Sequence, residues 1–314
     1  MEGKKITIIG LGGVGGYFGF KLAYQYKNNP TVKITFVARG ETYTRVKASG
    51  LTLLSPEHVD PVVRPDTIID EIAHLPESDL ILICVKEYDL EQVCLQIKEK
   101  IKADTLLLPL MNGVDIYERM RNIITTGVVF PACVYVASHI KEKGVVEHKG
   151  NRGKIIVGKD PQKKSREPTW VVDVLKESGV DIIYKENALP DIWIKFFFIA
   201  SFGLVSARYN KPIGQVYEEP ELRARARAIM REIQQITIGK GITIPEDIIE
   251  LTFEKASTFP YHTPTSLQLD VHSNKAHTEL ELFAGAIIHY GRALHIPVME
   301  TEKIYAEIRQ NLVK

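Results

Sequence analysis

The sequence contains little cysteine and no excess of charge of either sign. Three cysteines, Cys84, Cys94 and Cys133, are scattered over 314 residues without C-x-x-C spacing. This pattern gives neither a disulfide framework nor a metal site, and it favours a reducing compartment. Lysine and arginine total 40 against 39 aspartates and glutamates, so no basic surface for nucleic acid or anionic lipid is expected. The arginine-rich residues 221–232 are interpreted as the solvated face of a helix.

Long uninterrupted apolar runs are also missing. The most apolar stretch, residues 192–205 (IWIKFFFIASFGLV), is too short to span a bilayer and contains Lys195. The apolar N-terminus lacks the small-residue cleavage site of a secretory signal. We therefore expect a soluble cytoplasmic protein without a membrane partner.

Two patterns of secondary structure divide a chain that is long enough for two domains. Up to residue 187, helical segments alternate with short β-rich runs, among them residues 79–85, 105–111, 127–137 and 153–158. This alternation predicts a mostly parallel, doubly wound sheet, with an antiparallel addition at residues 144–158. Beyond Pro190, prolines and glycines separate helices. We expect an α/β fold with a Rossmann-type domain over residues 1–187 and an all-helical domain over residues 188–314.

A cluster of glycines follows the first predicted strand, residues 6–9. Its sequence, Gly10-Leu11-Gly12-Gly13-Val14-Gly15, has the G-x-G-x-x-G spacing of dinucleotide-binding units. In such units the first glycine makes a tight turn, the second lets the backbone approach a pyrophosphate, and the third lets the helix lie close to the sheet. The anion then binds at the N-terminus of the helix. The alternative is a glycine-rich turn with a purely structural role.

The end of the second predicted strand, Val32–Val37, bears on the choice of cofactor. NAD-binding units commonly place a carboxylate here, which accepts a hydrogen bond from the ribose 2′-hydroxyl. This sequence has Ala38-Arg39-Gly40 instead. A guanidinium suits a 2′-phosphate, so the predicted cofactor is NADPH. Arg39 could otherwise be an ordinary surface charge, with Glu41 close enough to replace the missing carboxylate imperfectly.

Polar residues follow two further strands. Lys86 comes directly after residues 79–85, and Asn112 follows residues 105–111. Ligands of open α/β sheets bind beyond the carboxyl ends of the strands, so both side chains are expected to project toward the nicotinamide end of the cofactor. Each also has a local interpretation, because Lys86 can begin a helix and Asn112-Gly113 can form an ordinary turn.

One cation lies inside the most apolar predicted helix. Lys195 is flanked by Trp193 and by Phe196, Phe197 and Phe198. Burial of an ammonium group lowers its pKa unless an anion pairs with it, and such a lysine can protonate a carbonyl oxygen. It can also extend along the apolar surface to reach water.

Two more residues of the helical half stand out. In the helix predicted over residues 277–294, Glu279 falls on the apolar face, whereas Glu281 points the opposite way. A carboxylate on an apolar face needs a hydrogen-bonding or ion-pair partner, or a role in binding or catalysis. Ser266 is interpreted as a helix-start residue, because serine and threonine are favoured N-caps.

Together these segments resemble the ketopantoate reductases (2-dehydropantoate 2-reductases) over nearly the whole chain. The resemblance rests on GLGGVG, the lysine of CVKEYDL, MNGVD, the W-x-K-F around Lys195, TSLQLD and TELE. It implies a cytoplasmic NADP-dependent oxidoreductase of pantothenate biosynthesis, commonly dimeric. It also implies an NADPH-binding Rossmann domain, a helical domain for substrate and dimerisation, and a substrate cleft between them.

The resemblance also implies a role for each matching residue. Lys195 matches the catalytic lysine that protonates the ketone oxygen, and Glu279 matches the acid that holds the terminal hydroxyl of the substrate. Ser266 matches the residue that contacts the substrate carboxylate. Lys86 and Asn112 match residues on the cofactor side of the cleft, where Asn112 also meets the substrate.

Two departures from the family pattern leave the exact 2-oxo acid open. Ile199 and Gly203 stand where enzymes proven on ketopantoate carry asparagines, one and two turns after the lysine. One extra residue separates Asp270 from Glu279, with Asn274 near the usual glycine. The alternatives are a related reductase of another small 2-oxo acid and, from a different class, a regulatory protein that binds NADPH without turnover.

Overall fold

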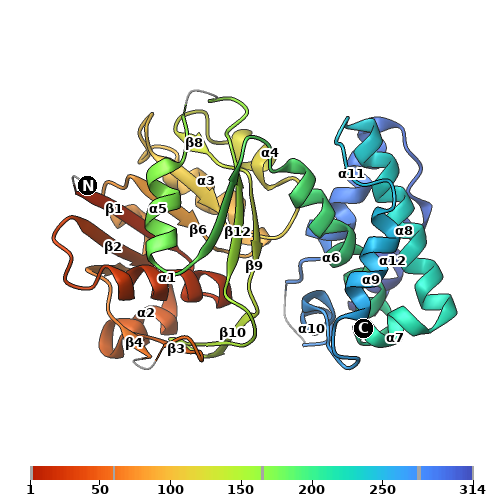
Figure 1. The fold of residues 1–314 in the computed structure, drawn as a ribbon, viewed down its shortest axis with the longest axis horizontal. Coiled ribbons are helices and arrows are strands. Elements are labelled where there is room, and N and C mark those ends of the chain that lie inside the picture. Colours follow the sequence, from red (N-terminus) through yellow and green to blue (C-terminus); the bar gives the residue numbers. More distant parts are fainter. Residues whose placement is uncertain (1–2, 59–60, 164–165, 274–276, 313–314) are drawn as a thin grey trace. The chain divides into compact units, whose positions relative to one another are not determined.

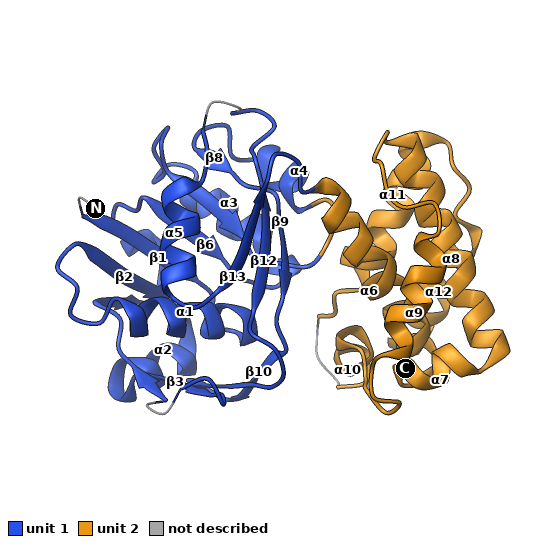
Figure 2. Cartoon of the chain, in the orientation of Figure 1, with its two compact units in different colours: residues 1–112, 116–188 blue, residues 113–115, 189–314 orange. Residues whose placement is uncertain are grey.

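The structure is a computed structural model that describes residues 3–58, 61–163, 166–273 and 277–312. The chain forms two compact units (Figure 2). The first unit consists of Met1–Asn112 and Ile116–Ala188, and the second of Gly113–Asp115 and Leu189–Lys314. Nothing in the sequence pattern indicated that the short segment after Asn112 belongs with the second unit.

A six-stranded parallel sheet forms the centre of the first unit (Figure 1). Its order is β5 (Thr67–Ile69), β2 (Val32–Val37), β1 (Lys4–Ile9), β6 (Leu80–Ile83), β7 (Leu106–Pro109) and β8 (Val128–Val129). Its connections include helices α1 (Gly13–Gln25), α2 (Gly40–Ser49), α3 (Glu87–Ile97) and α4 (Ile116–Arg121), and the 3₁₀ turn η1 (Ile72–His74). This arrangement confirms the predicted doubly wound α/β fold.

Two smaller sheets complete the first unit. One has the order β10 (Ser138–Glu142), β11 (Val145–His148), β3 (Leu51–Leu54), β4 (Val62–Val63). The other has the order β13 (Asp181–Lys185), β12 (Lys154–Gly158), β9 (Ala132–Tyr135), with α5 (Thr169–Glu177) before β13. The antiparallel partner of β11 is β10, and that of β12 is β9. The two strands expected at residues 144–158 therefore belong to different sheets.

The run at residues 127–137 also differs from expectation, because it is not one strand. It breaks at Phe130-Pro131 into β8 of the central sheet and β9 of a small sheet. Proline has no backbone N–H to donate to a sheet, and the carbonyl of Pro131 accepts a hydrogen bond from the N–H of Gly158 instead. The chain therefore changes sheets at this proline.

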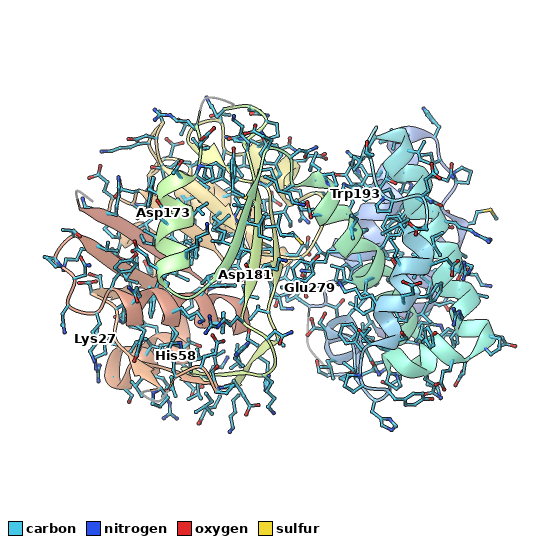
Figure 3. The ribbon with its side chains drawn as sticks, viewed as in Figure 1. Lys27, His58, Asp173, Asp181, Trp193 and Glu279 are labelled. Carbon is cyan, nitrogen blue, oxygen red and sulfur yellow. The ribbon has the colours of Figure 1, made fainter. Side chains whose placement is uncertain are left out.

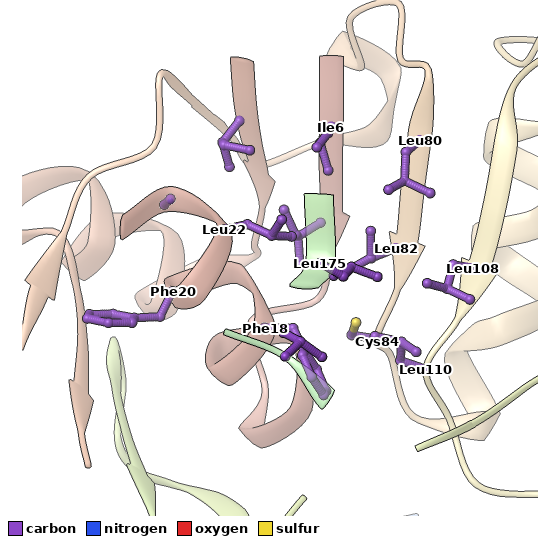
Figure 4. Close-up of a cluster of buried hydrophobic side chains, with 14 of the residues drawn as sticks. Ile6, Phe18, Phe20, Leu22, Leu80, Leu82, Cys84, Leu108, Leu110 and Leu175 are labelled. Carbon is purple, nitrogen blue, oxygen red and sulfur yellow. The ribbon is translucent and has the colours of Figure 1, made fainter. Parts of the chain in front are cut away.

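Helix α1 packs on the central sheet through side chains that are fully buried. Phe18 and Leu22 of this helix lie in one apolar cluster with Ile6, Leu82 and Leu108 from three successive strands (Figure 4). Strands buried on both faces are continuous apolar runs rather than alternating ones. This core fixes the end of α1 that carries the glycine-rich turn.

The second unit is helical in its described residues. Its elements are α6 (Leu189–Tyr209), α7 (Ile213–Glu218), α8 (Pro220–Gly239), α9 (Ile248–Ser257), α10 (Ser266–Val271), the π-helix η2 (Glu281–Gly285), α11 (Ala286–Leu294) and α12 (Met299–Leu312). Helix α6 contacts α8, α9, α10 and α12. By length and composition alone α6 could cross a membrane, but 67% of its most apolar window is buried, as in the core helix of a soluble protein.

The arginines of α8 are more than a solvated face. The Nη1 atom of Arg225 lies 2.8 Å from Oε2 of Glu307 and 2.7 Å from the Tyr209 hydroxyl, and its side chain is 13% exposed. Arg227 pairs with Glu250 on α9. These arginines therefore join neighbouring helices of the second unit by ion pairs.

Candidate functional site

The glycine-rich turn follows β1 at the carboxyl edge of the central sheet, and Gly10 and Gly15 are among its positions that leave no room for a side chain. Gly10 has φ of +91°, and a Cβ there would lie 2.9 Å from the carbonyl oxygen of Cys84 on the neighbouring chain segment. A Cβ at Gly15 would overlap the carbonyl oxygen of Gly10. The first glycine thus permits the left-handed turn, and the third permits close packing of α1.

The N-terminus of α1 suits an anion. Gly12 is its N-cap, nothing lies within 4 Å of the Cβ position there, and the first turn has no acidic residue. The N-cap offers no side chain to the first backbone N–H groups of the helix. Leu11 is buried, and Val14 packs against the core. These features fit a dinucleotide pyrophosphate.

Ser138 is a polar residue beside this turn that the sequence analysis missed. It lies on β10, where a Cβ at Gly13 would be only 2.5 Å from its carbonyl oxygen. Its Oγ atom is buried and has no hydrogen-bond partner among the described residues. The contact with the turn is made by the backbone of Ser138, so β10 packs closely against the start of α1 at Gly13. No sequence signal places Ser138 here, because the contact depends on the packing of a separate sheet.

Arg39 lies at the end of β2, where the sequence analysis placed it. It precedes α2 as the N-cap residue, and its side chain is 71% exposed. Its Nη2 atom lies 3.0 Å from Oδ2 of Asp89 in the first turn of α3. Glu41 lies in the first turn of α2, with Oε1 3.6 Å from Nε of Arg45. The guanidinium therefore faces a carboxylate that the sequence analysis did not consider.

Lys86 and Asn112 follow the neighbouring strands β6 and β7 at the same edge of the sheet. Lys86 is exposed and is the N-cap residue of α3. This position agrees with the alternative interpretation that Lys86 begins a helix. Asn112 is half-buried, and Gly113 after it has φ of +111°. The first unit thus brings the glycine-rich turn, Arg39, Lys86 and Asn112 to one edge.

Lys195 lies in the first half of α6 and is half-buried. The ring of Trp193 is 5.8 Å from that of Phe196 and 5.7 Å from that of Tyr290, centroid to centroid. Ile199, one turn after Lys195, is half-buried, and Gly203, two turns after it, is buried. The helical face that carries the lysine therefore continues with residues that have no hydrogen-bonding side chain.

Glu279 is buried, as expected, but the single α-helix predicted over residues 277–294 is wrong. Glu279, which is labelled in Figure 3, is only 5% exposed and lies in a turn before the π-helix Glu281–Gly285. The regular α-helix begins at Ala286. A π-helix has a longer hydrogen-bonded repeat than the 3.6-residue period used to assign its faces. Exposed Glu281 accepts a hydrogen bond from the Tyr305 hydroxyl.

Ser266 begins α10 but does not cap it. The N-cap is Thr265, whose Oγ1 accepts a hydrogen bond from the N–H of Gln268 at 3.2 Å, and the Gln268 side chain accepts one from the N–H of Thr265. This capping box leaves Ser266 as an exposed first-turn residue. Its neighbour Leu267 lies 3.7 Å from the Cβ position of Gly203 on α6. Asn274 lies outside the described residues.

The fold and these residues define an oxidoreductase of the Rossmann type with a separate helical unit. The sequence matches the family model "Ketopantoate reductase PanE/ApbA" over residues 6–162 and the model of its C-terminal domain over residues 187–312. The chain belongs to this family of NAD(P)-dependent oxidoreductases, which act on CH–OH groups. The predicted resemblance is thereby confirmed.

Individual relatives are distant. A 2-dehydropantoate 2-reductase of Mesorhizobium japonicum is 23% identical over 99% of this chain and 98% of the relative. An uncharacterized oxidoreductase of Bacillus subtilis, YkpB, is also 23% identical, over 97% and 98%. A PanE/ApbA family ketopantoate reductase of Ralstonia eutropha superposes with a TM-score of 0.88 at 25% identity, covering 98% of both chains.

The same fold occurs in an enzyme with a different name. D-mandelate dehydrogenase, solved with NADH and anilino(oxo)acetate, superposes with a TM-score of 0.86 at 18% identity over 98% of both chains. The fold is therefore shared by proteins named for different substrates and does not by itself identify a substrate.

Proposed function

We propose that the chain is a cytoplasmic, NADPH-dependent reductase that converts ketopantoate (2-dehydropantoate) to pantoate in pantothenate biosynthesis and works as a homodimer. The observation that carries this proposal is the position of Lys195, a half-buried cation among buried aromatic side chains of α6. An ammonium group is a proton donor, and a positioned lysine can act as the general acid that protonates a ketone oxygen.

Residues 1–187 are proposed to hold the cofactor. Gly10, Gly12 and Gly15 accommodate the pyrophosphate, and Arg39 contacts the 2′-phosphate. When bound, NADPH supplies the hydride that reduces C2 of the substrate. Lys86 and Asn112, at the carboxyl edge of neighbouring strands, are assigned to the nicotinamide side, where Asn112 also contacts the substrate.

Residues 188–314 are proposed to bind the substrate and to form the dimer contact. Nζ of Lys195 donates its proton to the ketone oxygen, so that a 2-hydroxy acid results, and the neutral amine regains a proton from water. Glu279, which is buried, accepts a hydrogen bond from the terminal hydroxyl of the substrate, and Ser266 donates one to its carboxylate. A related ketopantoate reductase from Staphylococcus aureus is described as dimeric, which supports the assignment of a dimer.

A second candidate function is the reduction of another small 2-oxo acid. The face of α6 that carries Lys195 continues with Ile199 and Gly203 rather than with amide side chains. Such a face favours a substrate tail that is less polar than that of ketopantoate. A purely regulatory NADPH-binding protein is less consistent with the chain, because it would need neither Lys195 nor Glu279.

The proposal is tested by following NADPH oxidation with a panel of 2-oxo acids that includes ketopantoate, for the wild type and for Lys195→Ala. Turnover of at least one acid that depends on Lys195 supports a reductase. NADPH binding without turnover of any acid in the panel would instead favour the regulatory alternative.

A further inference from the structure

The ion pair between Arg39 and Asp89 joins two elements that are not neighbours in the central sheet. Arg39 follows β2 and Asp89 follows β6, whereas β1 lies between these strands. Adjacent strands are about 4.8 Å apart, so the pair bridges elements separated by about 10 Å. The only strand it crosses is the one that leads into the glycine-rich turn.

Gly10 lies between the two ends that this ion pair connects. Its N–H donates to the carbonyl of Val37 at 3.0 Å, and the N–H of Cys84 donates to the carbonyl of Ile9 at 2.9 Å. The residues after β2 and β6 therefore flank the turn directly. Arg39 and Asp89 extend from these two flanks and meet at 3.0 Å.

A 2′-phosphate at the end of β2 would require the same guanidinium. Its charge of about −2 and three acceptor oxygens would compete with a carboxylate that carries one negative charge. Asp89 is 28% exposed and Arg39 is 71% exposed, so their attraction is weakened by water and can be exchanged for a stronger anion. The ribose 2′-hydroxyl of NADH carries no charge, so it does not compete with Asp89 for the guanidinium of Arg39.

We infer that Asp89 competes with the 2′-phosphate of NADPH for Arg39 and thereby limits the preference of this protein for NADPH over NADH. This inference rests on the proposed contact between Arg39 and the 2′-phosphate. Asp89 acts through Arg39 and is a specificity-determining residue rather than a catalytic one. In the absence of the carboxylate, the guanidinium is available to the phosphate without an exchange of partners.

The test measures dissociation constants of NADPH and NADH by fluorescence titration of the full chain, in the wild type and in Asp89→Asn. We expect Asp89→Asn to bind NADPH about threefold more tightly, in keeping with the strength of exposed ion pairs, and NADH with unchanged affinity. The gain should shrink in high salt. Unchanged or weaker NADPH binding by Asp89→Asn would overturn the inference; weaker binding would mean that Asp89 positions Arg39 for the phosphate.

A matched control is Glu91→Gln, which removes the same charge from an exposed position on the same helix. This variant should leave the NADPH to NADH ratio unchanged. If Glu91→Gln shifts the ratio of NADPH to NADH affinity as much as Asp89→Asn does, the shift is caused by the net charge of α3. In that case the inference fails.

A double-mutant cycle with Arg39→Gln separates the inference from the proposed function. Asp89→Asn should have no effect on the ratio once Arg39 is replaced; an equal gain in that background would mean that Asp89 repels the phosphate directly. If Arg39→Gln alone leaves the ratio unchanged, the proposed cofactor contact is wrong. If Arg39→Gln lowers the ratio and Asp89→Asn does not raise it, only the competition is wrong.

Discussion

Nζ of Lys21 lies 2.7 Å from Oε2 of Glu57, and the side chains are 2% and 13% exposed. Lys21 belongs to α1, the helix that begins in the glycine-rich turn, and Glu57 lies in the connection after β3. The Tyr17 hydroxyl donates to Oε1 of Glu57 at 2.9 Å and accepts from the N–H of Gly153. This network links α1 to both smaller sheets and so stabilises the helix at the proposed cofactor site.

Replacing Glu57 with glutamine should destabilise the first unit and reduce its sensitivity to acid. Removal of one partner leaves the buried ammonium of Lys21 unpaired, which costs about 3 kcal/mol or more of unfolding free energy. Burial opposes ionisation of Glu57, but hydrogen bonds from Lys21 and Tyr17 outweigh it and hold its pKa below the usual value. A lowered pKa gives stability that is present above about pH 4.3 and is lost as the pH falls further.

Urea unfolding at several pH values between about 7 and 3 would measure both effects. Glu57→Gln should lower the midpoint at neutral pH and flatten its decline in acid. Glu99→Gln, at an exposed position of the same unit, serves as the control and should leave the midpoint unchanged. A wild-type pH dependence in Glu57→Gln would show that the carboxylate does not stabilise the fold.

Arg39→Ala should remove the preference for NADPH. A hydrogen bond to a charged group contributes about 1.5–3 kcal/mol, so the wild type should bind NADPH at least about tenfold more tightly than NADH. The variant should bind both cofactors with similar affinity. Equal affinities in the wild type, or unchanged discrimination in Arg39→Ala, would contradict the assignment of the 2′-phosphate to this residue.

The parts of the fold that depend on local pattern were predictable from the sequence. The β-rich runs and the glycine spacing predicted the parallel sheet and the turn at Gly10, because both follow from local residue type. The division of residues 127–137 into two strands depends on Pro131 and on which sheet each half joins. Which sheet a strand joins is decided by packing between distant segments, and the local residue pattern of a single sequence does not show it.

The candidate site was predictable where one residue interrupts a pattern and not where two distant segments meet. Lys195 was singled out because it is a charge in an apolar stretch, and Glu279 because it falls on the apolar face of the predicted helix. The π-helix after Glu279 was missed because face assignments assumed a regular α-helix, and Thr265 was overlooked as the cap beside Ser266. Asp89 was missed because its contact with Arg39 depends on the order of strands in the sheet.

Lys195→Ala should abolish most turnover while preserving the binding of NADPH. A positioned proton donor usually contributes about 10²- to 10⁴-fold to the rate, whereas the proposed cofactor residues belong to the other compact unit. Stopped-flow measurement of hydride transfer, together with NADPH titration, would separate the two effects. Lys303→Ala, which removes an exposed lysine of α12, is the matched control. Normal turnover in Lys195→Ala would exclude the lysine as the acid.

Ile199→Asn should improve the reduction of ketopantoate. The isoleucine lies one helical turn after Lys195, so its side chain belongs to the face that carries the proposed acid. A polar substrate group that meets an apolar side chain there loses hydration without gaining a hydrogen bond, at a cost of about 1–3 kcal/mol. Under the second candidate function, in which the substrate tail is less polar, we therefore expect weak activity of the wild type on ketopantoate and a gain in kcat/KM of about tenfold in the variant.

The measurement compares kcat/KM for ketopantoate with that for 2-oxo acids that carry apolar tails. Ile199→Asn should raise the first value and lower the others, because an amide in the site stabilises a polar tail and is itself left unpaired beside an apolar one. Ile238→Asn makes the same substitution at a side chain that is 64% exposed on α8 and should change neither value. If the wild type reduces ketopantoate better than every other acid, and kcat/KM for ketopantoate does not rise in Ile199→Asn, the absence of the amide does not alter specificity. Ketopantoate is then the substrate.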